Sequence, residues 1–197
     1  MPRQSILNDR HRQLGSRLDG DTWNGMPIPW SYDRDPHEEV IATRSRAALY
    51  DVSALNIVHV EGPDAEAVLD RLVTIDITRL APGSARLAAE VDERGVLVDD
   101  IMVIRDSAEH FRLSHGSGAT PRTLAALAEG RRVSVRPDTD VHILSLQGPL
   151  SLQVLAPHAG TDLAGLRYFH HRDTTLFGRP VTIGRGGYSG ELGYEIF

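Results

Sequence analysis

Several short stretches in the middle of the chain are rich in branched apolar residues and bounded by turn residues or polar segments, and this pattern predicts β-strands. The predicted strands cover 57–60, 85–91, 97–104 and 110–115. Two intervening stretches, 62–72 and 120–128, have helical spacing; Pro63 and Pro121 stand at favourable helix-start positions, and Thr120 is predicted to cap the second helix. The segment 132–135 ends this section. The pattern predicts one compact α+β unit around an antiparallel sheet, with 110–115 as the hairpin partner of 97–104.

The segments on either side of this unit are also patterned. On the N-terminal side the spacing predicts helices over 5–18 and 35–47, a loop over 20–30 and an extended piece over 49–52. On the C-terminal side it predicts a strand over 141–146, a helix over 147–155 and strands over 175–177 and 180–183. Gln147-Gly148-Pro149 echoes Glu61-Gly62-Pro63, which hints at an internal repeat, although two short matches are weak evidence.

Two adjacent carboxylates, Asp99 and Asp100, interrupt the strand that follows the turn at Arg94-Gly95. Successive strand residues face opposite sides of a sheet, so one carboxylate must point into whatever lies beneath it. Burying a carboxylate costs free energy unless it meets a partner, a cation or a proton. The pair is therefore a candidate for chemistry. The alternative is that one aspartate faces solvent and the other caps a neighbouring backbone.

The composition is that of a globular protein and excludes several function classes. The chain has 197 residues, of which 41% are hydrophobic and 24% charged, and its net charge of −6 argues against a nucleic-acid partner. Without cysteine there is no disulfide framework, thiolate zinc site or cysteine nucleophile, which fits a cytoplasmic location. We expect no signal peptide and no membrane span, because no apolar run is long enough.

The C-terminal stretch from Gly184 onward is rich in glycine. A phosphate-binding loop would need a lysine that is absent here, and a dinucleotide fingerprint would need glycine at Ser189. The glycines instead predict a backbone that approaches a flat ligand or a neighbouring strand. Four residues of the stretch supply aromatic faces and carboxylates suited to a nitrogen heterocycle: Tyr188, Glu191, Tyr194 and Glu195.

Metal and hydrolase chemistry have little support in the sequence. His170-His171 is the only histidine cluster, and adjacent strand residues face opposite ways, so we expect no metal site there. The chain contains no Gly-x-Ser-x-Gly motif to anchor a hydrolase triad.

Five motifs together carry a family resemblance: Tyr50-Asp51-Val52-Ser53, Val60-Glu61-Gly62-Pro63-Asp64-Ala65, Gly95-Val96-Leu97-Val98-Asp99-Asp100, Leu146-Gln147-Gly148-Pro149 and, near the end, Gly187-Tyr188-Ser189-Gly190-Glu191 with Gly193-Tyr194-Glu195. With these motifs in this order, the chain from about Ser5 to its last residue resembles the glycine-cleavage T-protein family. These proteins are tetrahydrofolate-dependent aminomethyltransferases, with related demethylases and folate-binding domains.

The resemblance implies an α+β, T-protein-like folate-binding fold, a cloverleaf of domains with folate in a central channel. It implies a discontinuous first domain, 1–53 with 138–197, and a second, ferredoxin-like α+β domain, 54–137, inserted into it. Family members are longer than this chain. The resemblance therefore also implies that the C-terminal barrel lies outside this chain. The sequence is then either a fragment or one subunit of a split enzyme, and in the second case we expect a partner chain to supply the C-terminal half.

Carried over residue by residue, the resemblance also implies a site. Asp100 matches the catalytic aspartate near the reactive folate nitrogens. Tyr188 and Glu195 match pterin-contacting positions, and Tyr168 falls where a folate-facing aromatic residue is common.

Several positions depart from the family pattern. Leu87 replaces a common aromatic folate contact, and His115 lies in Ser114-His115-Gly116, which replaces Val-Val-Asn; both remain cofactor-binding candidates. Ala54-Leu55 replaces the His-Met that usually follows Asp-Val-Ser. These changes weaken a specific glycine-cleavage assignment more than they weaken the family.

Two functions follow from the resemblance. The first is an enzyme, or one part of a split or multi-subunit enzyme, that transfers a methyl or aminomethyl group from a small N-, O- or S-linked donor to tetrahydrofolate. The second is a non-catalytic folate-binding or assembly subunit of a multimeric amine oxidase-like complex.

The end of the chain carries a separate expectation. Gly193-Tyr194-Glu195-Ile196-Phe197 has the pattern of a strand with nothing after it to pair with or cover it. This predicts an unprotected edge strand, which a partner chain or self-association would complete.

Overall fold

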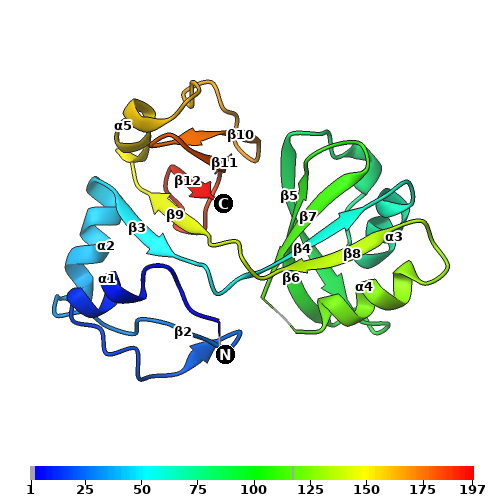
Figure 1. Ribbon diagram of the computed structural model, residues 1–197, viewed down its shortest axis with the longest axis horizontal. Helices are drawn as coiled ribbons and strands as arrows, with labels where there is room; N and C mark the ends of the chain where they lie inside the picture. The colour runs from blue at the N-terminus through cyan, green and yellow to red at the C-terminus, as the bar shows by residue number, and fades with distance from the viewer. Residues whose placement is uncertain (1–2, 117) are drawn as a thin grey trace. The chain divides into compact units, whose positions relative to one another are not determined.

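The computed structural model describes residues 3–116 and 118–197, which form two compact units (Figure 1). Unit 1 contains residues 1–54 and 142–197, the two flanks of the chain, and unit 2 contains residues 55–141. No helix among the described residues is long and apolar enough to cross a membrane.

Unit 2 is a five-stranded antiparallel sheet with two α-helices. Its elements in chain order are β4 (Asn56–Glu61), α3 (Ala65–Leu72), a 3₁₀ turn (Ile77–Arg79), β5 (Ser84–Val91), β6 (Leu97–Arg105), β7 (His110–His115), α4 (Thr120–Ala128) and β8 (Ser134–Asp138). The strand order is β5-β6-β7-β4-β8. With β5 set aside as an added edge strand, the rest follows the β-α-β-β-α-β order of a ferredoxin-like fold.

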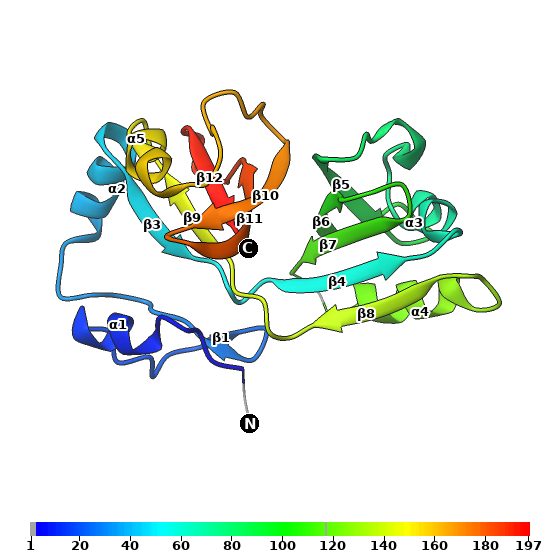
Figure 2. The same ribbon diagram turned by 45° about the horizontal axis from the view of Figure 1, so that its top comes forward.

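Both helices of unit 2 cover the same face of its sheet (Figure 2). The apolar residues of α3 recur at helical spacing and meet every second residue of the strands, for example Val68 against the face that carries Ile101 and Val103. This core contains Phe111 and Leu113 of β7 and Leu124 of α4, all fully buried. The odd-numbered residues of β6 therefore face the helices, and the even-numbered ones face the other side.

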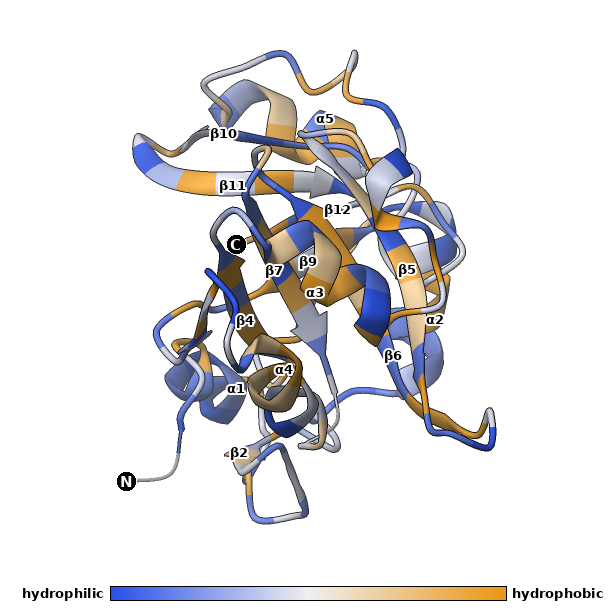
Figure 3. Ribbon diagram, turned by 90° about the vertical axis from the view of Figure 1, so that its right-hand side faces the viewer, coloured by the Kyte–Doolittle hydropathy of each residue, from blue (hydrophilic) through white to orange (hydrophobic). Residues whose placement is uncertain are grey.

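Unit 1 is built around a second five-stranded antiparallel sheet, in the order β10-β11-β12-β9-β3. Its elements are α1 (Asn8–Gln13), β1 (Thr22–Trp23), β2 (Met26–Pro27), α2 (Pro36–Ser45), β3 (Ala48–Asp51), β9 (Leu144–Gln147), α5 (Ser151–Leu155), a 3₁₀ turn (Ala156–His158), β10 (His171–Leu176), β11 (Arg179–Arg185) and β12 (Gly193–Ile196). The alternation of apolar and polar residues is visible along β11 in Figure 3. One face carries the core, which includes Ile183, Tyr194 and Leu155.

The expectation for the C-terminal strand is wrong. β12 is the central strand of its sheet: Glu195 pairs with Gly184 of β11 on one side and with Ser145 of β9 on the other. The edges of this sheet are β3 and β10. The two flanking strands are contributed by earlier parts of unit 1, so β12 leaves no open ladder for a partner to complete.

Two local predictions for the N-terminal flank are also corrected. The helix expected over 5–18 is only Asn8–Gln13, because Gly15 adopts φ 99° and the N–H of Ser16 bonds the carbonyl of His11, which ends a helix. Asn24 and Gly25, within the expected loop, form the two-residue turn of the β1–β2 hairpin. Both have positive φ, 49° and 75°, as a type I′ hairpin turn requires.

The predicted cap of α4 is wrong as well. Ala119 is the N-cap residue, and Thr120 lies inside the first turn. Its hydroxyl donates to Glu90 Oε2 at 2.7 Å instead of to the helix backbone.

A buried polar network ties the N-terminal flank to β3. Asp51 Oδ2 lies 2.8 Å from His11 Nε2 and accepts the hydroxyl of Ser5, and the other ring nitrogen of His11 lies 2.8 Å from the hydroxyl of Tyr32. Burial alone would raise the pKa of Asp51, but the hydrogen bonds from Ser5, Ser53 and His11 outweigh it, and the pKa is lowered. The carboxylate is thus stabilised in its ionised form in the folded chain.

This network predicts an acid-sensitive contribution to stability. Because the folded-state pKa of Asp51 is depressed, its contribution is present above the unfolded pKa, near 4, and is lost as the pH falls through the folded pKa. We expect Asp51→Asn to lower the free energy of unfolding by about 2 kcal/mol at pH 7 and by less at pH 3. Urea denaturation at both pH values measures this. Asp9→Asn, at an exposed ion pair with Arg12, is the control; equal losses at the two positions would contradict the assignment.

Candidate functional site

The two adjacent aspartates of β6 lie on opposite faces of the unit 2 sheet. Asp99 is 7% exposed and faces the helices, whereas Asp100 is exposed on the other face. One carboxylate does point into the interior, as the strand pattern requires, and it is not the one matched to the catalytic position. The turn before the strand is capped by Asp92, whose Oδ1 accepts the N–H groups of Arg94 and Val96.

Asp99 belongs to a buried polar cluster between the sheet and α4. It pairs across the ladder with Glu90, which is 3% exposed. The hydroxyls of Thr120 and Thr123 donate to the two oxygens of Glu90, at 2.7 and 2.8 Å, and Thr120 Oγ1 also lies 3.3 Å from Asp99 Oδ2. His115 Nδ1 is 3.8 Å from the same carboxylate. These contacts hold α4 against β5 and β6.

The structure brings together only part of the predicted set in unit 2. Leu87 of β5 pairs with Met102, two residues from Asp100, and so shares the open face with Asp100 and is 41% exposed. His115 is 1% exposed and pairs with Ile101, on the helix face. His115 therefore cannot join Leu87 and Asp100 at one ligand, and its role as a cofactor contact is not supported.

In unit 1, Glu195 has small neighbours on both sides. Gly184 and Ser145 are its direct cross-strand partners, and Gly193 is the next residue of β12 on the same face. Burial raises the pKa of the Glu195 carboxyl. Gly184 places no side chain beside the Glu195 carboxylate, whereas the space in front of Gly193 is filled by the side-chain amide of Gln147.

The glycine-rich segment that carries Tyr188 is shaped around one buried amide, that of Gln147. A Cβ atom on Gly187 or Gly193 would lie 2.1 or 2.2 Å from Gln147 Nε2. The prediction that these glycines allow a close approach to a neighbouring strand is confirmed, since Gln147 belongs to β9. No sequence pattern marks Gln147 as a functional residue, although it stands in one of the family motifs.

The four aromatic and acidic residues of this segment have different roles. Tyr194 is 3% exposed, its ring lies in the core, and its hydroxyl donates to the carbonyl of Leu163. Glu191 forms an ion pair with Arg44 at 3.0 Å. Tyr188 is 70% exposed. Glu195 is partly exposed.

Tyr168 lies beside the start of the glycine-rich segment. Its neighbour Phe169 donates its backbone N–H to the carbonyl of Arg185, and the Tyr168 and Phe169 rings are 4.3 Å apart. Tyr168 is exposed, as a ligand-facing aromatic residue would be.

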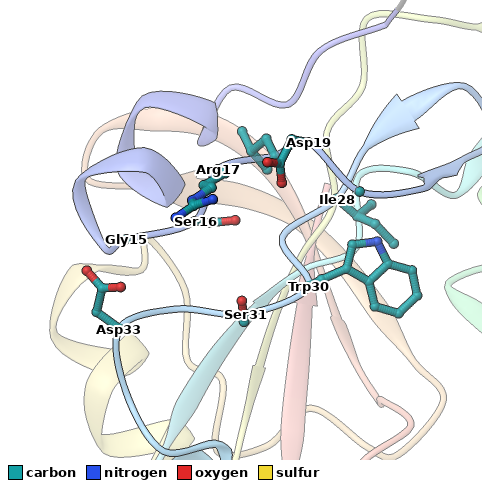
Figure 4. Close-up of a pocket in the computed structure, with 10 residues that line it drawn as sticks. Gly15, Ser16, Arg17, Asp19, Ile28, Trp30, Ser31 and Asp33 are labelled. Atoms are coloured by element: carbon teal, nitrogen blue, oxygen red, sulfur yellow. The ribbon is translucent and has the colours of Figure 1, made fainter.

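A polar hollow of about 440 Å³ lies elsewhere in unit 1, between the segments 15–20 and 28–33 (Figure 4). Its lining includes Arg17, Asp19, Trp30 and Asp33, and none of the six predicted site residues. Among the described residues, no group of three or more histidines and carboxylates is placed to hold a metal ion.

The fold and these motifs agree with one protein family. The family model described as the GCVT N-terminal domain matches residues 7–197. The chain belongs to this family. The GCVT N-terminal domain match covers both flanks and the inserted unit, so it accounts for the discontinuous order of the elements.

Named relatives of this GCVT-family chain fall into two groups. It is 47% identical to the heme-dependent oxidative N-demethylase gamma subunit of Ectopseudomonas mendocina, over 99% of this chain and 51% of the relative. It is 35% identical to an aminomethyltransferase of Streptomyces coelicolor, over 99% of this chain and 53% of the relative. The chain thus spans about half the length of the curated relatives it matches.

Solved structures agree with the family assignment. The glycine cleavage system aminomethyltransferase T from Bartonella henselae superposes with a TM-score of 0.88 and 27% identity, over 100% of this chain and 53% of that one. The heterotetrameric sarcosine oxidase from Corynebacterium sp. U-96 matches with a TM-score of 0.60 and 19% identity, over 81% of this chain and 80% of that one. The second match shows a shared fold alone.

Proposed function

We propose that the chain is the folate-binding part of an enzyme that transfers a methyl or aminomethyl unit to tetrahydrofolate and works together with a partner chain. The observation that carries this proposal is the setting of two carboxylates: Asp100 is exposed on β6, and Glu195 is half-buried on β12 with Gly184 as its cross-strand partner. Relatives that are named aminomethyltransferases and a demethylase subunit support it. The N-demethylase relative favours an N-linked donor among the N-, O- and S-linked donors.

The residues of unit 1 fit a pterin. A carboxylate accepts two parallel hydrogen bonds from the edge of an aminopyrimidine, and Glu195 is the carboxylate on the face of β12 opposite the core residues Tyr194 and Ile196. Gly184, its cross-strand partner in β11, places no side chain beside it. Tyr188 and Tyr168 are exposed aromatic residues that would offer their ring faces to a planar ligand.

Asp100 has the surroundings of a proton acceptor held in place by backbone. Asp100 pairs with Ala89 of β5, and the next residue, Ile101, pairs with His115 of β7, which fixes the backbone at Asp100. When bound, tetrahydrofolate supplies the nitrogen atoms that accept the carbon and release protons as they do so. Asp100 would orient the donor groups and take up a proton, a role that general-base and electrostatic effects make significant.

One observation supports a second function, that of a non-catalytic subunit. The relative at 47% identity is named as a gamma subunit, so this chain could serve a complex as a folate-binding or assembly subunit without a catalytic group of its own. The replacement of a common aromatic contact by Leu87 is consistent with that role. Under this alternative, Asp100→Asn would leave the activity of the assembled complex unchanged.

The pterin role of Glu195 predicts pH-dependent folate binding. Because burial raises the pKa of this carboxyl, falling pH protonates it and removes one hydrogen-bond acceptor. We expect tetrahydrofolate affinity to fall as the pH falls through this raised pKa. Glu195→Gln should bind about tenfold more weakly at neutral pH, with a flatter pH profile. Calorimetry measures both, and Glu38→Gln, on the exposed first turn of α2, is the control. Equal affinity in Glu195→Gln and the parent would remove the pterin role.

A further inference from the structure

We propose that Gln147 is a positioning residue that orders the glycine-rich segment 184–193 for ligand binding. The inference rests on the proposed function, because the segment carries Tyr188 and leads directly into the strand that carries Glu195. In this role Gln147 contacts neither the pterin ring nor the reacting atoms, but it fixes the positions of the residues that contact the ligand.

The side-chain amide of Gln147 has all its hydrogen-bonding groups engaged. It is 2% exposed. Nε2 donates to Ser145 Oγ at 2.8 Å and to the carbonyl of Gly186 at 3.0 Å, which uses both of its hydrogens. Oε1 accepts the hydroxyl of Ser189 at 2.7 Å. These three partners fix the orientation of the amide, because exchanging its oxygen and nitrogen would set two acceptors, Oε1 and the Gly186 carbonyl, against each other.

The hydrogen bonds of this amide reach the segment on both sides of Tyr188. Gly186 and Ser189 flank Tyr188, so the residue matched to a pterin contact lies between two anchors. Ser189 also fixes the next part of the segment, because its Oγ accepts the N–H of Glu191 at 3.1 Å. Ser145, the third partner, is the direct cross-strand neighbour of Glu195.

Two glycines give the amide its space. Cβ atoms at Gly187 and Gly193 would both lie within 2.3 Å of atoms of the Gln147 amide. Gly187 and Gly193 must therefore lack side chains, because the amide of Gln147 occupies the space that a Cβ atom would need. The packing of Gln147 therefore explains glycine at both positions, and no phosphate-binding or dinucleotide-binding role is needed to explain it.

A second contact holds the segment from outside. Arg44 of α2 donates to the carbonyl of Ser189 at 2.8 Å and pairs with the carboxylate of Glu191 at 3.0 Å. The Arg44 side chain is 54% exposed, so this contact is weaker than the buried amide network. Gln147 is therefore the residue whose loss should loosen the segment most.

The test replaces Gln147 with glutamate in the full chain. Glutamate has nearly the same shape, but its carboxylate has no hydrogen to give to Gly186. We expect tetrahydrofolate affinity to fall by about tenfold at pH 7.5. At pH 5.5, a protonated carboxyl can donate one hydrogen bond again, so the affinity ratio of variant to parent should recover in part. A side chain with only a packing role would show no such recovery.

A second measurement tests the order of the segment 184–193 in the absence of folate. Amide hydrogen exchange of the peptide covering 184–193 should become faster in Gln147→Glu and unchanged in Gln153→Glu, an exposed glutamine of α5. Ser189→Ala, which removes only one hydroxyl, is the milder variant if Gln147→Glu does not fold. It should change both readouts in the same direction, by about threefold in affinity.

The outcomes separate the two proposals. If the parent chain does not bind tetrahydrofolate, the proposed function fails, and hydrogen exchange alone decides whether Gln147 orders the segment. If exchange at 184–193 is the same in Gln147→Glu and the parent, the positioning role is overturned. It is also overturned if exchange accelerates while affinity stays at the parental value.

Discussion

Asp100→Asn is expected to lower one-carbon transfer by a factor of about a hundred or more while leaving the fold intact. Asp100 is exposed on β6, and asparagine has nearly the same shape, so folding loses little. Asparagine cannot take up a proton as a carboxylate does. Single-turnover transfer to tetrahydrofolate, measured with the complete enzyme, tests the effect on activity, and urea denaturation tests the effect on stability.

Asp99→Asn is the matched control, because it lies next in the same strand. Asp99 is buried beside Thr120 and opposite Glu90, so its replacement disturbs a buried polar cluster. We expect a loss of about 1–3 kcal/mol in the free energy of unfolding and little change in activity per folded molecule. Reversed effects, with stability lost at Asp100 and activity lost at Asp99, would show that the catalytic role is assigned to the wrong carboxylate.

Gly148→Ala is expected to destabilise unit 1 by about 2–5 kcal/mol. Gly148 has φ 124°, which residues with a Cβ rarely adopt. A Cβ there would lie 2.5 Å from the carbonyl oxygen of Arg46 and 2.7 Å from that of Thr43, at the end of α2. Both obstacles are backbone atoms, and Arg46 O already accepts the N–H of Leu150, so the helix end cannot move aside without losing this bond.

Gly186→Ala provides the control for this prediction. No atom lies within 4 Å of a Cβ at Gly186 apart from its chain neighbours, and its φ is outside the positive range. Denaturant midpoints of the two variants should therefore differ clearly. If the denaturant midpoints of Gly148→Ala and Gly186→Ala agree within experimental error, the end of α2 can move aside without loss of stability, and the prediction is wrong.

Gly148 also explains the tripeptide echo in the sequence. Gly62, its counterpart in unit 2, has φ 135°, and a Cβ there would lie 2.4 Å from the carbonyl oxygen of Arg132. In both units a strand ends at a glycine that lies against a neighbouring carbonyl, and a helix follows. The echo therefore reflects the same local turn, used twice.

Local pattern was sufficient for much of the fold. Runs of branched apolar residues bounded by turns predicted β5, β6 and β7, and the helical spacing of apolar residues over 65–72 predicted α3. Such signals are local, because the side of an element that packs into the core is apolar. The glycine-rich tail was also interpreted correctly as a close approach to a strand. The Asn24-Gly25 turn was missed although its signal is local, since only a loop was inferred from the prolines around it.

The sequence by itself determined the family, the order of the elements and the fact that Asp99 and Asp100 face opposite ways, since all three follow from neighbours along the chain. Tertiary structure alone decided which face the helices cover, and so placed His115 inside and Asp100 outside. It also made β12 a central strand and brought Gln147 to Gly187. The pairing of β12 with β9 and the contact of Gln147 with Gly187 join residues about 40 or more positions apart in the chain, and a local sequence pattern does not identify such distant partners.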